Sequence, residues 1–229
     1  MIAARDLSLA IEGRIILDGV TFDVRRGEAV ALVGANGSGK TSVLRCLLGL
    51  VPFTGRATID GHDVVRDPVV ARALVGYVPQ KAAFGDARAG EVLAFAARLR
   101  RLDPRCGTDL LATVGLAAHA REAVRTFSGG MQQRLALAVA LLGEPPVLLL
   151  DEPSASLDEE GQHTFFALMT RLRHAGHTLL LASHRAEEVA ALADRVLHLD
   201  RGRLVAPAER PARVIPLGPR VERRGGDRP

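Results

Sequence analysis

The feature that most constrains this chain is a glycine-rich segment at residues 34–41, which follows the pattern GxxxxGK[ST]. A short apolar run with strand character, residues 28–33, precedes it, and apolar side chains at helical spacing follow it at residues 41–50. In this arrangement glycines let backbone N–H groups converge on phosphate oxygens, and the following helix points its positive end at them. The segment therefore predicts a site for the phosphates of a nucleotide.

The side chains of this loop have separate predicted roles. Lys40 is expected to neutralise the β- and γ-phosphates, and Thr41 to bind Mg²⁺. The chain has 30 Lys and Arg residues but only two lysines, Lys40 and Lys81, so it places lysine where a compact charge is required. The predicted nucleotide-binding residues of the loop are Gly34, Asn36, Gly37, Ser38, Gly39, Lys40, Thr41 and Ser42.

The loop also narrows the identity of the base. Guanine-specific proteins with such a loop generally read the base with an Asn-Lys-x-Asp segment, whereas the only asparagine of this chain is Asn36, within the loop. The sequence therefore disfavours a GTPase of that kind.

Two adjacent acids, Asp151 and Glu152, follow an apolar strand predicted at residues 147–151. Neighbouring side chains of a strand point in opposite directions, so the two acids are expected to do different jobs. Asp151 is expected to orient Mg²⁺, directly or through water, and Glu152 to act as general base on the attacking water. Alone, such a pair is more often a solvated strand end; together with the phosphate loop it predicts nucleotide hydrolysis.

The order of the predicted elements indicates an α/β fold. Strands at residues 3–11 and 15–24 form a hairpin, and strands alternate with helices from residue 147 to 200, which predicts a mostly parallel sheet covered by helices. Only helical patterns occur at residues 87–142, so a helical subdomain is expected there. Residues 1–205 are expected to form a single domain, and residues 206–229, with five of the 12 prolines, a disordered tail.

Composition argues against several other classes. Cys46 and Cys106 show no CxxC pairing, so neither a disulfide framework nor a zinc site is expected. No signal peptide and no apolar run of about 18 residues is found, so a cytoplasmic protein is expected. The net charge is +4, but six arginines against three acids at residues 206–229 supply +3 of it, so nucleic-acid binding is not expected.

A second glycine motif opens a long predicted helix at Ser128, Gly129 and Gly130, within the segment FSGGMQQR. A serine N-cap alone would explain this local pattern. The order of all the motifs adds more, because over residues 3–205 they resemble the domains of ABC ATPases. In chain order these motifs are the phosphate loop, Gln80 after a short strand, the SGG helix, the LLLDEP strand, Asp158, and His184 after a strand.

The resemblance implies a P-loop NTPase core with an N-terminal antiparallel β subdomain and a helical signature subdomain. It implies that two domains pair head to tail, so that Ser128, Gly129 and Gly130 of one domain hold the γ-phosphate on the phosphate loop of the other. It also implies that Gln80 contacts Mg²⁺ and water, that His184 holds the γ-phosphate and the attacking water, and that Asp158 links the two sites.

For function, the resemblance implies an ATPase with ATP and Mg²⁺ as cofactors. Its partners would be an integral membrane permease, held at the inner face of the cell membrane, and a second copy or a paralogous ATPase. The segment at residues 81–88 would receive a coupling helix of the permease. The alternative is a soluble ABC ATPase that acts on the ribosome or on DNA. The ribosomal class normally has two such domains in one chain. The DNA-repair class has a long coiled coil between the phosphate loop and the signature, whereas in this chain only 87 residues separate Lys40 from Ser128.

Three positions depart from the family pattern. Ile11 stands where an aromatic residue usually stacks on adenine, which predicts weaker base selectivity. Phe127 and Met131 replace the commoner leucine and glutamine of the signature. A methionine at position 131 resembles the signature of exporter-type ATPases and of the ATPases of copper-enzyme maturation, including the nitrous-oxide reductase system. An exporter is favoured over an importer because residues 206–229 are too few for the regulatory domain that sugar importers often have.

Overall fold

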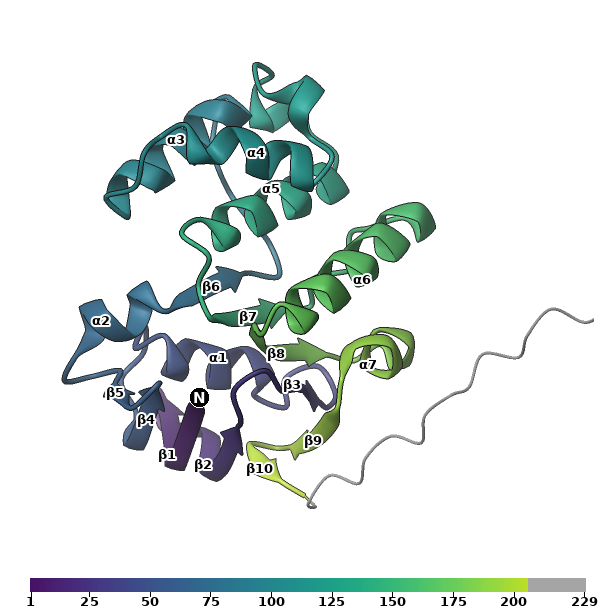
Figure 1. The fold of residues 1–229 in the computed structure, drawn as a ribbon. Coiled ribbons are helices and arrows are strands. Elements are labelled where there is room, and N and C mark those ends of the chain that lie inside the picture. Colours follow the sequence, from purple (N-terminus) through teal and green to yellow (C-terminus); the bar gives the residue numbers. More distant parts are fainter. Residues whose placement is uncertain (206–229) are drawn as a thin grey trace, which may run out of the picture.

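Two β-sheets and the helices around them make up the part of the chain that the computed structural model describes, residues 1–205 (Figure 1). The tail predicted at residues 206–229 lies outside the described residues. One sheet has the strand order β2-β1-β4-β5, and the other has the order β10-β9-β3-β8-β7-β6. The predicted α/β fold, with an antiparallel β part and a mostly parallel sheet, is confirmed.

The antiparallel sheet begins with the predicted hairpin. β1 (Ile2–Ile11) pairs with β2 (Arg14–Val24), and the turn between them has positive φ angles at Glu12 and Gly13. On its other side β1 pairs with β4 (Thr54–Ile59), which in turn pairs with β5 (His62–Asp63). The sequence analysis missed β4 and β5, because β5 has only two residues and β4 buries only Ala57 and Ile59, too few apolar side chains for a strand pattern to show.

The six-stranded sheet carries the predicted motifs at one edge. Its strands are β3 (Ala29–Val33), β6 (Val75–Val78), β7 (Val147–Asp151), β8 (Thr178–Ser183), β9 (Arg195–Asp200) and β10 (Arg203–Leu204). All pairs except β9 with β10 are parallel. The carboxyl ends of β3, β7 and β8 therefore meet at one edge, with the phosphate loop after β3, the two acids at the end of β7 and His184 after β8.

The helices cover this sheet. They are α1 (Lys40–Leu47), α2 (Pro68–Ala73), α3 (Ala89–Leu99), α4 (Cys106–Thr113), α5 (Gly129–Leu141), α6 (Glu159–His174) and α7 (Ala186–Leu192), with 3₁₀ turns at η1 (Ala117–His119) and η2 (Val124–Thr126). Figure 1 shows α3, α4 and α5 grouped together above β6 and β7, in the stretch where only helical patterns were predicted. The sequence analysis missed α2, which has fewer than two turns.

Alternate residues of β7 face two different hydrophobic cores. Val147 and Leu149 pack in a core with α1 and the antiparallel sheet, whereas Leu148 and Leu150 pack in a core with α3, α4, α5 and α6. Because successive side chains of a strand point to opposite faces, this division means that the sheet is covered on both sides. Double coverage explains why β7 and β8 are apolar along nearly their whole length.

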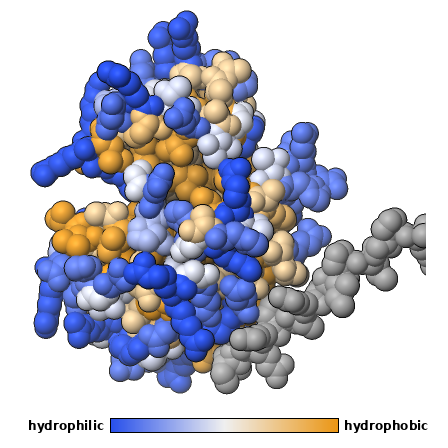
Figure 2. Space-filling model, viewed as in Figure 1, coloured by the Kyte–Doolittle hydropathy of each residue, from blue (hydrophilic) through white to orange (hydrophobic). Residues whose placement is uncertain are grey.

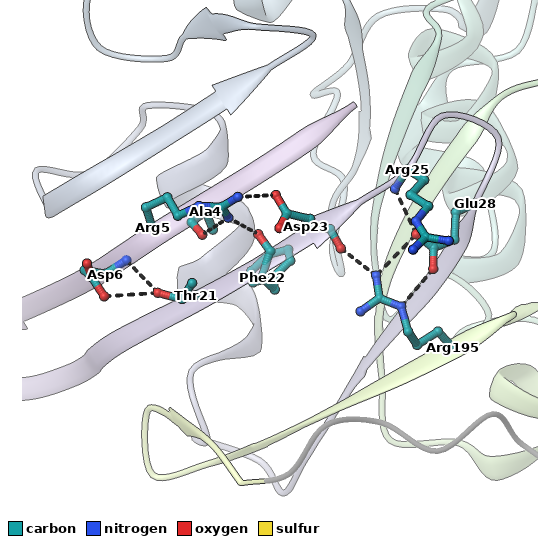
Figure 3. A network of polar contacts seen from close by, with 9 residues as sticks. All are labelled: Ala4, Arg5, Asp6, Thr21, Phe22, Asp23, Arg25, Glu28 and Arg195. Carbon is teal, nitrogen blue, oxygen red and sulfur yellow. Dashed lines mark hydrogen bonds and ion pairs between the residues drawn. The ribbon is translucent and has the colours of Figure 1, made fainter.

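Arg195 joins the two sheets at the edge opposite the phosphate loop (Figure 3). Its Nε donates to Glu28 Oε1 at 2.8 Å, and its Nη2 donates to the carbonyl oxygen of Asp23 in β2. Burial raises the pKa of Glu28, but the hydrogen bonds from Arg195 and from the backbone N–H of Arg25 outweigh it and hold that pKa below its usual value. Through both contacts, Arg195 anchors the antiparallel sheet to the starts of β3 and β9.

Candidate functional site

The phosphate loop connects β3 to α1 and requires glycine at its first and sixth positions. A Cβ atom at Gly34 would overlap the carbonyl oxygen of Leu199 in β9. Gly39 is the N-cap of α1 with a φ of 110°, and a Cβ there would lie 2.8 Å from a methyl carbon of Leu17. The loop is therefore held tightly between β9 and β2, with its backbone at the amino end of α1.

Lys40 is buried at the first position of α1. Its Nζ donates to the carbonyl oxygens of Gly34 at 2.8 Å and Ala35 at 3.2 Å, and it lies 3.8 Å from Glu152 Oε1. The loop thus curls around the ammonium group, and the positive charge is held where the loop and the two acids meet.

Thr41 and Asp151 bring two oxygen donors together beside Lys40. Thr41 Oγ1 donates to Asp151 Oδ1 at 3.0 Å. Burial raises the pKa of Asp151, the Thr41 hydrogen bond opposes this, and the nearby Glu152 adds to the rise. A cation would offset the cost of burying this carboxylate.

These residues fit a magnesium nucleotide. Mg²⁺ prefers oxygen ligands and is usually held by one or two protein groups plus substrate phosphates, which suits Thr41 and Asp151. Within residues 1–205 no three His, Cys, Asp or Glu side chains come together as a self-sufficient metal site. In the loop itself, the buried hydroxyl of Ser38 has no hydrogen-bond partner among residues 1–205, so it is free to bond a phosphate oxygen.

Glu152 and His184 form a contact pair across the ends of β7 and β8. His184 Nδ1 lies 2.8 Å from Glu152 Oε2. The Glu152 side chain is buried, whereas that of His184 is 53% exposed. Glu152 has a φ of 49°, an unfavourable backbone conformation for a residue other than glycine, and its N–H donates to Ala182 O at 2.9 Å. The structure therefore holds this carboxylate between Lys40 and His184.

The signature residues lie in a second cluster. Ser128 is the N-cap of α5, and its hydroxyl accepts from the Met131 N–H at 3.2 Å. Gly129 and Gly130 pack against Ser156, since a Cβ at Gly130 would be 3.1 Å from the Ser156 carbonyl oxygen. No polar contact of Ser128 in the described residues joins it to the phosphate loop of the same chain.

No hydrogen bond among the described residues joins Asp158 or Gln80 to the phosphate loop. Asp158 is the N-cap of α6, where its Oδ1 accepts from the Gly161 N–H at 2.9 Å. Gln80 is exposed on the loop after β6. Gln133, to which the sequence analysis gave no role, donates from α5 to the carbonyl oxygen of Pro79 at 3.2 Å. The signature helix is thus bonded to the start of the loop that carries Gln80.

Comparison with known proteins decides the family. The family model described as ABC transporter matches residues 17–155, from β2 to just beyond Glu152. The chain belongs to the ABC transporter family. The predicted resemblance to ABC ATPase domains is confirmed, and ATP is the nucleotide that this domain binds.

Individual relatives and structures agree. The chain is 31% identical over 212 residues to the linearmycin resistance ATP-binding protein LnrL of Bacillus subtilis, covering 90% of this chain and 68% of that one. It is 39% identical over 196 residues to the daunorubicin resistance ATP-binding protein DrrA3 of Streptomyces coeruleorubidus, covering 83% of this chain but 62% of that one. A solved ATP-binding subunit of an ABC transporter superimposes with a TM-score of 0.85 at 28% identity, covering 92% of this chain and 90% of that one.

No helix among residues 1–205 of this ABC protein is both long enough and apolar enough to span a bilayer.

Proposed function

We propose that this chain is the ATP-hydrolysing subunit of a membrane transporter and that a separate permease forms the path through the membrane. The observation that carries the proposal is the cluster of Lys40, Thr41, Asp151, Glu152 and His184 at one edge of the parallel sheet. These are the groups that ATP hydrolysis needs: a cation for the phosphates, oxygen ligands for a metal, and a base for water.

Each residue of the cluster has a proposed role. The backbone N–H groups of the loop and Lys40 bind the β- and γ-phosphates, while Thr41 and Asp151, joined by Gln80, hold Mg²⁺, which would supply charge neutralisation. Glu152 accepts the proton of the attacking water. An Nδ1–H of His184 donates to Glu152 and fixes the carboxylate in place.

We further propose that two copies, or a copy and a paralogue, close head to tail over two ATP molecules. In one chain Gly129 and Gly130 pack against Ser156, and no polar contact of Ser128 within residues 1–205 joins it to the phosphate loop, which supports an action on the partner's nucleotide. Asp158 follows this segment directly and would sit at the contact between the two sites. Hydrolysis then lets the dimer reopen.

An apolar notch supports the permease as partner. A groove of about 430 Å³ is lined by residues 49–53, which follow α1, by Val64 and Val65, which precede α2, and by Pro68 and Arg72 of α2. α3 carries two further exposed apolar side chains, Phe95 and Leu99. Figure 2 shows apolar surface on both sides of the hollow between α2 and the helical part of the molecule. Exposed apolar patches of this kind mark partner-binding sites, and a permease helix fits this one.

Backbone hydrogen bonds join the segment after Gln80, where the resemblance implies a permease contact, to the segment that leads into the signature. The N–H of Val124 donates to the carbonyl oxygen of Ala87 at 2.9 Å, and the N–H of Ala89 donates to that of Glu122 at 3.1 Å. The segment after Gln80 is thus paired with the segment that leads into Ser128. A displacement of the first by a permease would carry the second with it.

We propose export as the direction of transport. The relatives LnrL and DrrA3 are named for resistance to linearmycin and daunorubicin, and a further solved structure that superimposes with a TM-score of 0.82 at 27% identity, over 90% of this chain and 38% of that one, is a bacterial Atm1-family exporter with ATP bound.

Val65→Glu tests the permease contact. Co-expressed with the membrane protein that co-purifies with it, the wild-type chain should sediment with the membranes. The Val65→Glu variant should bind at least about tenfold more weakly, because the interface would have to desolvate a carboxylate. Val205→Glu, at a similarly exposed valine in another part of the chain, is the matched control. Equal sedimentation of Val65→Glu and wild type would place the contact elsewhere.

Ile11→Tyr tests how the base is held. Ile11 and Ile15 are exposed at the end of the hairpin, and the carbonyl oxygen of Ile16 borders Gly39 of the phosphate loop. A tyrosine ring there should stack on adenine and add about 0.5–1.5 kcal/mol, which lowers the ATP dissociation constant about two- to tenfold. Titration with a fluorescent ATP analogue measures this, with Val69→Tyr on α2 as control. Unchanged affinity would remove Ile11 from the base site.

A further inference from the structure

Two polar side chains, Gln162 and Arg185, join the starts of α6 and α7, which lie next to each other (Figure 1). Arg185 Nη2 donates to Gln162 Oε1 at 3.0 Å. Gln162 Nε2 in turn donates to the carbonyl oxygen of Leu157 at 2.9 Å. The amide group thus has a partner at its donor end and another at its acceptor end, which fixes its orientation. The proposed mechanism gives neither side chain a role.

The arginine end of this pair adjoins the hydrolytic site. Arg185 directly follows His184, and its backbone N–H donates to the Ser183 hydroxyl at 3.1 Å. His184 Nδ1 lies 2.8 Å from Glu152 Oε2. The backbone next to His184 is therefore anchored to α6 through the side chain of Arg185.

The glutamine end adjoins the turn at residues 154–158, which precedes α6. Leu157 of this turn is buried in the core that also contains side chains of α5. The turn packs against the signature, since a Cβ atom at Gly130 would lie 3.1 Å from the carbonyl oxygen of Ser156 and 3.5 Å from a methyl carbon of Leu157. A shift of this turn would therefore act on Gln162 through the carbonyl oxygen of Leu157.

We propose that Gln162 and Arg185 are positioning residues for ATP hydrolysis, which couple the turn at residues 154–158 to His184. Through the pair, closure of a second chain on this turn is transmitted to His184 and its contact with Glu152. The inference rests on the proposed hydrolysis and head-to-tail closure, and it assigns to the pair no contact with the nucleotide. Loss of the pair should slow hydrolysis and leave ATP binding intact, because misplacing a catalytic group by a fraction of an ångström lowers turnover.

A second arginine makes a comparable link between the same two helices and provides a matched control. Near the carboxyl end of α6, Arg173 Nη1 donates to the carbonyl oxygen of Leu192, the last residue of α7, at 3.2 Å. The side chains of Arg185 and Arg173 are 28% and 32% exposed. Both arginines therefore join α6 to α7 at similar burial, but Arg173 lies at the ends of these helices that are remote from His184.

Arg185→Met removes the donor and keeps a side chain of similar length. We expect kcat for ATP to fall about tenfold and KM to change less than about twofold. Arg173→Met should keep the kcat of the wild type, at a temperature at which circular dichroism shows both variants folded. Arg185→Lys, which can still donate to Gln162 Oε1, should restore most of the turnover.

Gln162→Glu separates the two hydrogen bonds of the amide. The carboxylate still accepts from Arg185, and a negative charge in the first turn of α6 favours the helix, but it cannot donate to the carbonyl oxygen of Leu157. This variant should therefore be as slow as Gln162→Leu, which loses both bonds. Combined with Glu152→Gln, Arg185→Met should still form a dimer with ATP, which would place its defect after closure.

A double variant of Gln162→Leu and Arg185→Met tests whether the two residues act as a unit. It should be no slower than the slower single variant. A kcat of Arg185→Met within about twofold of wild type, an equal loss of kcat in Arg173→Met, full turnover in Gln162→Glu, or multiplying effects in the double variant would each overturn the inference. An inactive wild-type chain, or a Glu152→Gln variant that forms no dimer with ATP, would instead overturn the proposed function, so the two failures are distinguishable.

Discussion

Glu152→Gln should reduce ATP turnover by at least about a hundredfold and leave ATP binding intact, because the amide cannot accept the proton of the attacking water. Glutamine has the same size and keeps the His184 contact, so the strained backbone at this position is not disturbed. With hydrolysis blocked, ATP should hold two chains together. The variant is therefore expected to elute as a dimer with ATP and Mg²⁺ and as a monomer with ADP, as size-exclusion chromatography with light scattering would measure.

The control for this variant is Glu144→Gln. Glu144 is exposed in the turn before β7, whereas Glu152 follows the other end of the same strand. The control should retain full turnover and show no stable dimer. Wild-type turnover in Glu152→Gln would remove the carboxylate from the role of base, and a variant that stays monomeric with bound ATP would contradict the head-to-tail closure.

The sequence was informative where the chemistry is local. The phosphate loop and the acids after β7 are contiguous segments, and each has a strand before it that burial on both faces makes apolar. Helix boundaries were less certain. Only helical patterns were predicted over residues 87–142, but α3 ends at Leu99, where Arg100 donates to the carbonyl oxygen of Leu142 and Arg101 has a φ of 58°.

Contacts between distant segments were not predictable from the sequence. His184 was selected by its place after a strand, yet its contact with Glu152 depends on the register of β7 and β8, in which Asp151 stands opposite Ala182. Glu187 and Glu188 are the same residue type at adjacent positions, but Glu187 is exposed and Glu188 is buried. Only the packing of α7 against the sheet distinguishes them.

Lys40→Ala should weaken ATP binding itself, in contrast to Glu152→Gln. The ammonium group is buried, so a phosphate bound there would make charge-assisted hydrogen bonds with little screening by water. Such a bond contributes about 1.5–3 kcal/mol, which corresponds to an increase of about 10- to 100-fold in the ATP dissociation constant. Equilibrium titration with ATP at fixed Mg²⁺ measures the change, and turnover should fall with occupancy.

Lys81→Ala provides a control within the same chain, because Lys81 is the only other lysine and is exposed on the loop after Gln80. Removing that charge should leave ATP affinity unchanged. The Lys40→Ala variant should also remain folded, because alanine is a good helix former at the first position of α1 and the loop carbonyl oxygens can bond water. Wild-type ATP affinity in folded Lys40→Ala would mean that the backbone of the loop binds the phosphates without this cation, and the nucleotide site would then have to be reassigned.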